Sequence, residues 1–279
     1  MTTTLTPPPV SPGPPPASSP SSSGRIIAIV LIVIGAVIIL GAVASAVFAT
    51  VAAASARTTS TALAVDGVSD LDVDVSAGSL RIEFTDTREA ELEVTSSWGL
   101  ARWTLEREGD ELNVASPQGF FNGGWLWGGT GDAVLRLPST LKGIDADLGL
   151  SAGDLRVDAA FDEVNLEIGA GSADIQGIAR DLDAQVSAGS VDLDLENAIE
   201  VSIGLSAGSM DAVFTGSQPR SIDAEVSAGS LDLTVPEGEY NVQSEVSAGD
   251  FDNRIDSTSD ARSTIRVQLS AGSATLRAG

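Results

Sequence analysis

The 279-residue chain has no cysteine and no histidine. It therefore cannot form disulfide bonds, and it lacks the thiolate nucleophiles, imidazole bases and usual zinc ligands of many enzymes. Because disulfides are absent, any exported domain must be held together by packing alone. These absences favour a binding or structural protein without a cofactor over an enzyme.

Positive charge is scarce as well. Lysine and arginine together number 15, against 39 aspartate and glutamate residues, which gives a formal net charge of −24. The first acidic residue is Asp66, so the negative charge belongs to the larger, carboxyl-terminal part of the chain. A surface of this kind repels nucleic acid and anionic lipid headgroups and attracts cations. We therefore expect no nucleic acid partner.

Charged residues are missing altogether between Arg25 and Arg57. A helix of about 20 apolar residues crosses the hydrocarbon core of a membrane, so residues 25–50 predict a transmembrane helix, with the membrane as a partner. Residues 1–24 hold eight of the twelve prolines and predict a disordered Pro/Ser-rich tail. A cleaved signal peptide is the alternative, since small residues precede Arg57, although a long uncharged tail is unusual ahead of such a signal.

This organisation predicts a single-pass protein of the plasma membrane with a cytoplasmic amino terminus. Residues 51–62 are a linker in this interpretation, and residues 63–279 are an extracytoplasmic domain. The orientation depends on Arg25 and Arg57 alone. The acidic part is exported whether the apolar segment is an anchor or a cleaved signal, and the oligomeric state is left open.

A short motif, Ser-Ala-Gly or a close variant, recurs eight times in the acidic part. From the second copy onward its glycines are 18 to 23 residues apart, and a period of this size predicts stacked structural repeats. The motif glycines are Gly78, Gly153, Gly171, Gly189, Gly208, Gly229, Gly249 and Gly272.

Apolar residues recur at fixed positions around each motif glycine. They stand seven, five and three residues before it and two residues after it, except that Ser244 stands five residues before Gly249. Such alternation predicts a strand with one buried face, and it places the motif alanine on that face too. The alternation breaks at the glycine, where the chain can turn a corner and keep its apolar side inward.

The predicted fold is an all-β solenoid, or β-helix-like stack, of about eight short coils, preceded by one transmembrane α-helix. Coils stacked about 4.8 Å apart would let each strand pair with its copies above and below. An insertion at about residues 88–140 separates the first two copies and also contains strand signals. Within it, "EGDE" is typical of a hairpin turn, and "DAVLRLPS" returns the chain to the stack.

Four stretches together resemble a known family: "VDVSAGSLRI", "LEREGDELNV", "AVLRLPST" and "DADLGLSAGDLRV". They look like the bacterial adhesin-like β-strand-repeat domain of unknown function, which is related to toast-rack domains. The resemblance covers about residues 63–279. It implies a β-repeat fold next to a membrane segment and a role in envelope stress sensing or surface adhesion. It supplies no catalytic motif.

Aspartates recur three residues after the motif glycine in five copies. Stacked carboxylates repel one another unless they are solvated, protonated or bridged by a cation such as Ca²⁺. Because no calcium-binding consensus is present, we interpret the row as a solvated acidic face and predict no metal site. The five residues are Asp174, Asp192, Asp211, Asp232 and Asp252.

The candidate partner-binding residues are Phe120, Phe121, Trp125 and Trp127. They lie among glycines in "QGFFNGGWLWGGTG", which carries no charge. Aromatic side chains on such a loop suit an envelope protein, a glycan or a lipid interface. The alternative is that the loop caps an end of the stack.

The sequence therefore predicts a non-catalytic, membrane-anchored binding or envelope-sensing domain. The alternative is a structural or adhesive cell-surface protein.

Overall fold

The structure is a computed structural model that describes residues 57–96, 103–117 and 131–279. The predicted tail and transmembrane helix lie outside the described residues, as do Phe120, Phe121, Trp125 and Trp127. Within the described ranges no helix has the length and apolar character needed to cross a membrane.

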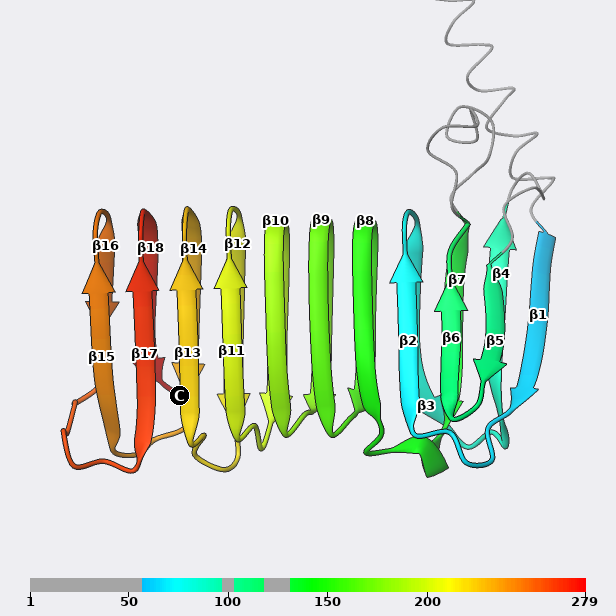
Figure 1. Ribbon diagram of the computed structural model, residues 1–279, viewed down its shortest axis with the longest axis horizontal. Helices are drawn as coiled ribbons and strands as arrows, with labels where there is room; N and C mark the ends of the chain where they lie inside the picture. The colour runs from blue at the N-terminus through cyan, green and yellow to red at the C-terminus, as the bar shows by residue number, and fades with distance from the viewer. Residues whose placement is uncertain (1–56, 97–102, 118–130) are drawn as a thin grey trace, which may run out of the picture. The chain divides into compact units, whose positions relative to one another are not determined.

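The described residues form an almost entirely β structure, apart from one 3-10 turn, Ser139–Leu141 (η1). Eight repeats each contribute one coil, defined here as a strand, the motif corner and the strand after it (Figure 1). Their strands are β2 (Asp70–Val75), β3 (Ser79–Thr85), β8 (Asp145–Ala160), β9 (Glu163–Ile178), β10 (Asp181–Glu196), β11 (Glu200–Leu205), β12 (Ser209–Thr215), β13 (Ser221–Val226), β14 (Gly229–Val235), β15 (Tyr240–Val246), β16 (Asp250–Asn253), β17 (Ser263–Leu269) and β18 (Gly272–Ala278).

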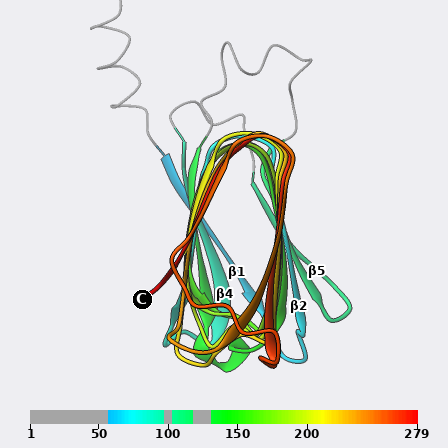
Figure 2. The same cartoon turned by 90° about the vertical axis from the view of Figure 1, so that its left-hand side faces the viewer.

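Neighbouring coils pair in parallel and in register. In β8, β9 and β10 a single strand bends through the corner, so that Gly153 pairs with Gly171 and Gly171 pairs with Gly189. Seen from the end of the stack, the coils form two facing layers that meet at the corners (Figure 2). Copies of the motif therefore lie directly over one another, as the predicted stacking requires.

The corner needs glycine for two reasons. All eight motif glycines have a positive φ, between 111° and 154°, in a region that other residues rarely adopt. They also stack closely, since a Cβ atom added to Gly189 would lie 2.1 Å from the carbonyl oxygen of Gly171. The motif thus recurs because every coil must turn at the same place beneath the corner above it.

Apolar side chains from both layers fill the space between them. The residues three positions before the motif glycine are 0 to 2% exposed in seven of the eight coils. These seven are Val75, Leu150, Ile168, Val186, Leu205, Val226 and Leu269. The eighth, Val246, is 42% exposed because its coil lies at the end of the stack.

The motif alanine does not lie on the buried face. Ala152, Ala170 and Ala188 are exposed and Ala77 is half-buried, so the prediction for this position was wrong. The inward alternation ends three residues before the glycine and resumes two residues after it. The alanine therefore belongs to the corner, and its small side chain points outward.

The coils at the carboxyl-terminal end are not stacked in chain order. β17 pairs with β13 on one side and with β15 on the other, while β18 lies between β14 and β16. The coil of β17 and β18 is thus last in the chain but second from the end of the stack, and the coil of β15 and β16 forms the end (Figure 1).

The insertion extends the stack at the opposite end. Its strands, together with the strand that begins at Arg57, are β1 (Arg57–Ala64), β4 (Glu89–Ser96), β5 (Thr104–Glu108), β6 (Glu111–Ala115) and β7 (Asp132–Pro138). β6 pairs in parallel with β2, and β7 pairs in parallel with β3. β5 and β6 form the predicted hairpin, β4 lies antiparallel to β7, and β1 lies antiparallel to β4.

Residues 57–62, which the sequence analysis assigned to the linker, thus form most of β1.

Candidate functional site

An acidic surface lies on the layer that contains the first strand of each coil. Alternate side chains of a strand point to opposite faces of a sheet, so residues between the buried positions project outward. In-register pairing aligns them into two rows, which we call the acidic face. Its members are Asp70, Asp145, Glu163, Asp181, Glu200 and Ser221 in one row, and Asp72, Asp147, Asn165, Asp183, Ser202 and Asp223 in the other.

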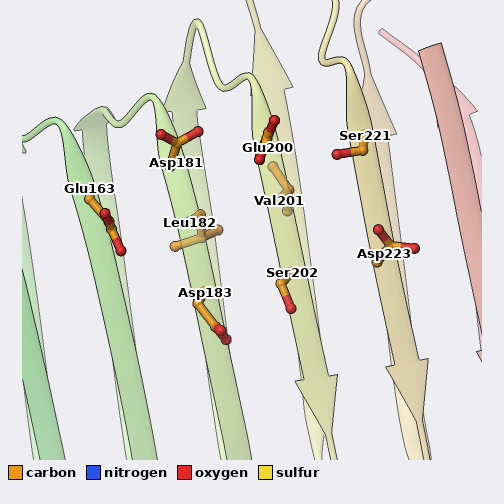
Figure 3. A pocket seen from close by; sticks show the side chains of 9 residues that line it. All are labelled: Glu163, Asp181, Leu182, Asp183, Glu200, Val201, Ser202, Ser221 and Asp223. Carbon is orange, nitrogen blue, oxygen red and sulfur yellow. The ribbon is translucent and has the colours of Figure 1, made fainter. Parts of the chain in front are cut away.

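One shallow depression of about 230 Å³ lies over β9, β10, β11 and β13. Figure 3 shows Glu163, Asp181 and Glu200 beside one another at the start of three successive strands. Leu182 and Val201 form its apolar floor. The depression therefore presents carboxylates around a small apolar patch.

Arginines neutralise part of this surface. Nη1 of Arg220 donates to Glu200 over 2.8 Å, and Arg266 forms an ion pair with Asp223. Nε of Arg180 donates to Asp181 over 3.2 Å. These arginines are themselves 47 to 69% exposed, and exposed ion pairs contribute little stability, so an incoming cation can compete with them.

A second depression of about 570 Å³ lies over β2, β8, β9 and β10. It opens where Gly149 has no side chain between Asp74 and Glu167. Asp72 and Asp147 also line it. Here the acidic face is concave and carries no positively charged lining residue.

Asp72 is the carboxylate most affected by its surroundings at this depression. Partial burial raises its pKa, and the negative charges of Glu111, Asp147 and Asp74 raise it further. Burial is the largest cause, and repulsion from neighbouring carboxylates, of which the sheet holds Asp147 in register with Asp72, adds to it. Such crowding favours binding of a positively charged group.

The predicted aspartate row lies on the other layer. Asp174, Asp192, Asp211 and Asp232 stand in register on adjacent strands, but Thr275 separates Asp232 from the fifth member, Asp252, because of the altered coil order.

Arginines meet the row near both ends. Arg156 forms an ion pair with Asp174, and Nη1 of Arg277 lies 3.7 Å from a carboxylate oxygen of Asp232. Within the described part of the chain, no three His, Cys, Asp or Glu side chains are grouped so as to hold a metal ion.

From the sequence we singled out this aspartate row and the aromatic loop, but not the acidic face. The signal was present, because Asp72, Asp147, Asp183 and Asp223 all stand six residues before a motif glycine. The predicted partner-binding residues Phe120, Phe121, Trp125 and Trp127 lie outside the described residues.

The chain matches no protein-family model and no curated protein. It is similar to a candidate cell adhesion protein from Clostridium sporogenes, at 12% identity and a TM-score of 0.33 over 80% of this chain and 100% of that one. It is similar to a candidate lipid-binding protein from Parabacteroides distasonis, at 13% identity and a TM-score of 0.38 over 80% and 96%.

A third similar structure is a candidate adhesin from Parabacteroides distasonis, at 10% identity and a TM-score of 0.40 over 80% of this chain and 97% of that one. At these identities and TM-scores the likeness carries no argument about what this chain binds. What the described residues establish is a β-strand-repeat domain with an acidic face on one layer.

Proposed function

We propose that the protein is a non-catalytic binding protein whose β-repeat domain acts outside the cytoplasm, anchored by residues 25–50, and contacts a cationic ligand through the acidic face. The observation that carries this proposal is the in-register alignment of outward carboxylates on successive strands, from Asp70 to Asp223. A ligand with regularly spaced positive groups, such as a basic protein segment or an amino-sugar polymer, fits this spacing.

A β-solenoid scaffold supports this function. Parallel strands about 4.8 Å apart fix the distance between successive carboxylates. The packed interior between the two layers leaves the face little freedom to rearrange, so the rows are preorganised for binding.

Open geometry favours binding over catalysis. The depression shown in Figure 3 is lined by exposed or half-buried carboxylates and half-buried serines. An active site brings a nucleophile, a base and an electrostatic stabiliser together in a site that excludes water. Asp192 and Asp194, a carboxylate pair on the other layer, are exposed as well.

The ligand test uses the full-length protein in detergent and a fluorescent oligolysine probe. We expect the double variant Asp147→Asn/Asp183→Asn to weaken binding of the probe at least tenfold. The control is Asp192→Asn/Asp211→Asn, which removes the same charge from the other layer. Equal losses in the two variants would show unspecific attraction by net charge and would overturn the site.

The topology is tested separately in intact cells. Protease added outside, or added to spheroplasts, should digest the part of the chain after Arg57 and spare an epitope placed in residues 1–24. Digestion of that epitope would overturn the orientation, and its absence from the mature protein would favour a cleaved signal.

Envelope sensing and adhesion differ in what happens after binding. Deletion of the gene should change the response to envelope stress if the protein senses, and should reduce attachment to surfaces if it adheres. The Asp147→Asn/Asp183→Asn variant should reproduce whichever effect depends on the acidic face.

A further inference from the structure

The two sheet layers end in four edge strands. At one end of the stack these are β15 and β16, each of which pairs with one described strand. At the other end they are β5, paired with β6, and β1, paired with β4. An edge strand offers unpaired backbone groups to any other strand, and natural proteins usually protect such edges with charge or a covering segment.

Three of these edges are protected. β5 carries Glu106, Arg107 and Glu108, and β16 carries two aspartates. β15 carries Glu245, and part of its outer edge is covered by the segment that follows β16. In that segment the N–H of Thr258 donates to the carbonyl oxygen of Tyr240 over 2.8 Å.

β1 is the exception among the four described edges. Beyond Arg57 at its start it has no charged residue, and it reads Thr-Thr-Ser-Thr-Ala-Leu-Ala. Thr58 to Ala62 are all exposed, and so is Ala64. The strand is eight residues long and pairs with β4 along its whole length.

On its inner side, β1 is also uncovered at Thr59 and Thr61, whereas Leu63 near its end packs against the core. From the first coil one layer continues through β7, β4 and β1, whereas the facing layer continues through β6 and β5 only. Thr59 and Thr61 pair with the buried Val94 and Leu92, and so point to the same side. They nevertheless remain exposed.

We propose that β1 is a self-association site, at which the β1 strands of two copies of this chain pair antiparallel about a twofold axis. The partner strand must lack charge and favour β structure, and β1 itself meets both conditions because threonine is enriched in strands. A twofold arrangement makes the same surface complementary to itself, as in most homodimers. This interface does not involve the acidic face and is independent of the ligand proposed above.

Electrostatics are compatible with this pairing. The glutamates nearest to β1 are Glu89, Glu91 and Glu93 of β4. In the dimer two β1 strands would separate the β4 strands, by three spacings or about 14 Å. Because the screening length is about 8 Å at physiological ionic strength, the repulsion is weak there, and the dimer should become stronger as salt is added.

Single cysteines test the proposal, because the chain has none of its own. Cysteine is introduced in turn at Thr58, Thr59, Ser60, Thr61 and Ala62 of the full-length protein in detergent, and mild oxidation follows. Disulfide-linked dimer should peak at one position and decline on both sides, because the distance between equivalent residues grows by about 7 Å per step from the axis.

Ser190→Cys, at an exposed site in the middle of the stack, is the control for random collision. A second variant combines the best cysteine with Thr59→Lys, or with Thr61→Lys if position 59 gives the best yield; it adds the missing edge charge and should reduce the yield to the control level. The proposal would be overturned by a dimer yield along β1 no higher than that of Ser190→Cys, or by a yield without a peak. It would also be overturned by a disulfide-linked product whose mass is not that of a dimer, or by a dimer yield that falls as salt is added.

Discussion

Val186 and Leu205 lie directly beside each other in neighbouring coils, paired across the parallel strands β10 and β11 and exposed by only 2% and 1%. Replacement of Val186 by Asp places an uncompensated carboxylate in this stack. We expect it to lower the free energy of unfolding by roughly 3 kcal/mol or more, measured by chemical denaturation. Val246→Asp is the matched control, because Val246 has the same motif position but is 42% exposed. Similar losses in both variants would contradict the stack.

Corner glycines can be tested by alanine substitution. Gly189→Ala meets both a φ of 137° and the carbonyl oxygen of Gly171, so the coils must separate locally. Gly109 also has a positive φ but has no atom within 4 Å of an added Cβ. We expect Gly109→Ala to cost about 1 kcal/mol and Gly189→Ala several times as much. Equal losses would show that close stacking is unimportant.

Tyr240, the sole tyrosine of the chain, reports on the end coil. Burial raises its pKa to about 12, and its hydroxyl donates to the carbonyl oxygen of Pro236 over 3.0 Å. Because the folded pKa exceeds that of an unfolded tyrosine, near 10, the stability from this side chain is complete below pH 10 and is lost as the pH rises toward 12.

Tyrosinate absorbance measures this directly. The native protein should titrate well above the urea-unfolded chain, and Tyr240→Phe should cost about 1 kcal/mol through the lost hydrogen bond. Coincident titration curves for the native and unfolded protein would refute burial of the ring.

Asp72 should destabilise the domain at neutral pH. The pKa of Asp72 is raised in the folded state, so protonation favours folding. The free energy of unfolding therefore falls as the pH rises from the ordinary pKa of 3.8 through the higher pKa of the folded state. Asp72→Asn should therefore raise the melting temperature at pH 7, with the gain vanishing below the ordinary value. Asp256→Asn, in an exposed loop, is the control for removal of one negative charge. An equal rise in melting temperature in that variant would show that the surroundings of Asp72 are not the cause.

The final coil should hold the end coil in place. In a chain that stops at residue 262, β15 and β16 lose β17 and β18, their strand neighbours. Hydrogen exchange should then become fast in residues 240–253 and remain slow in β11 and β12. Continued protection of residues 240–253 would mean that β15 and β16 can pair directly with β13 and β14.

The sequence predicted which side chains face inward better than it predicted which coils are neighbours. Period-two alternation identifies buried positions such as Val186, because burial of apolar surface is the main driving force. It does not identify the neighbouring coil, since most coils offer similar apolar rows. One residue carried a signal: Ser244 occupies a position that is apolar in the other coils, and a polar residue is least costly in the coil at the end.

The motif alanine and the acidic face were missed for different reasons. Ala188 was assigned to the buried face because the alternation was extended one step too far, into the corner. The acidic rows, which include Asp72 and Asp183, were overlooked because carboxylates on a wet strand face are usually unremarkable. Their significance comes from in-register pairing, which a single strand's sequence does not reveal.

Coil order also constrains how the domain can be made. A ribosome or an export channel delivers residues 240–253 before residues 263–278, yet the earlier segment docks on the later one. The strands β15 and β16 therefore gain their neighbours only after β17 and β18 have docked on β13 and β14, so the coils cannot be added in the order in which they are synthesised.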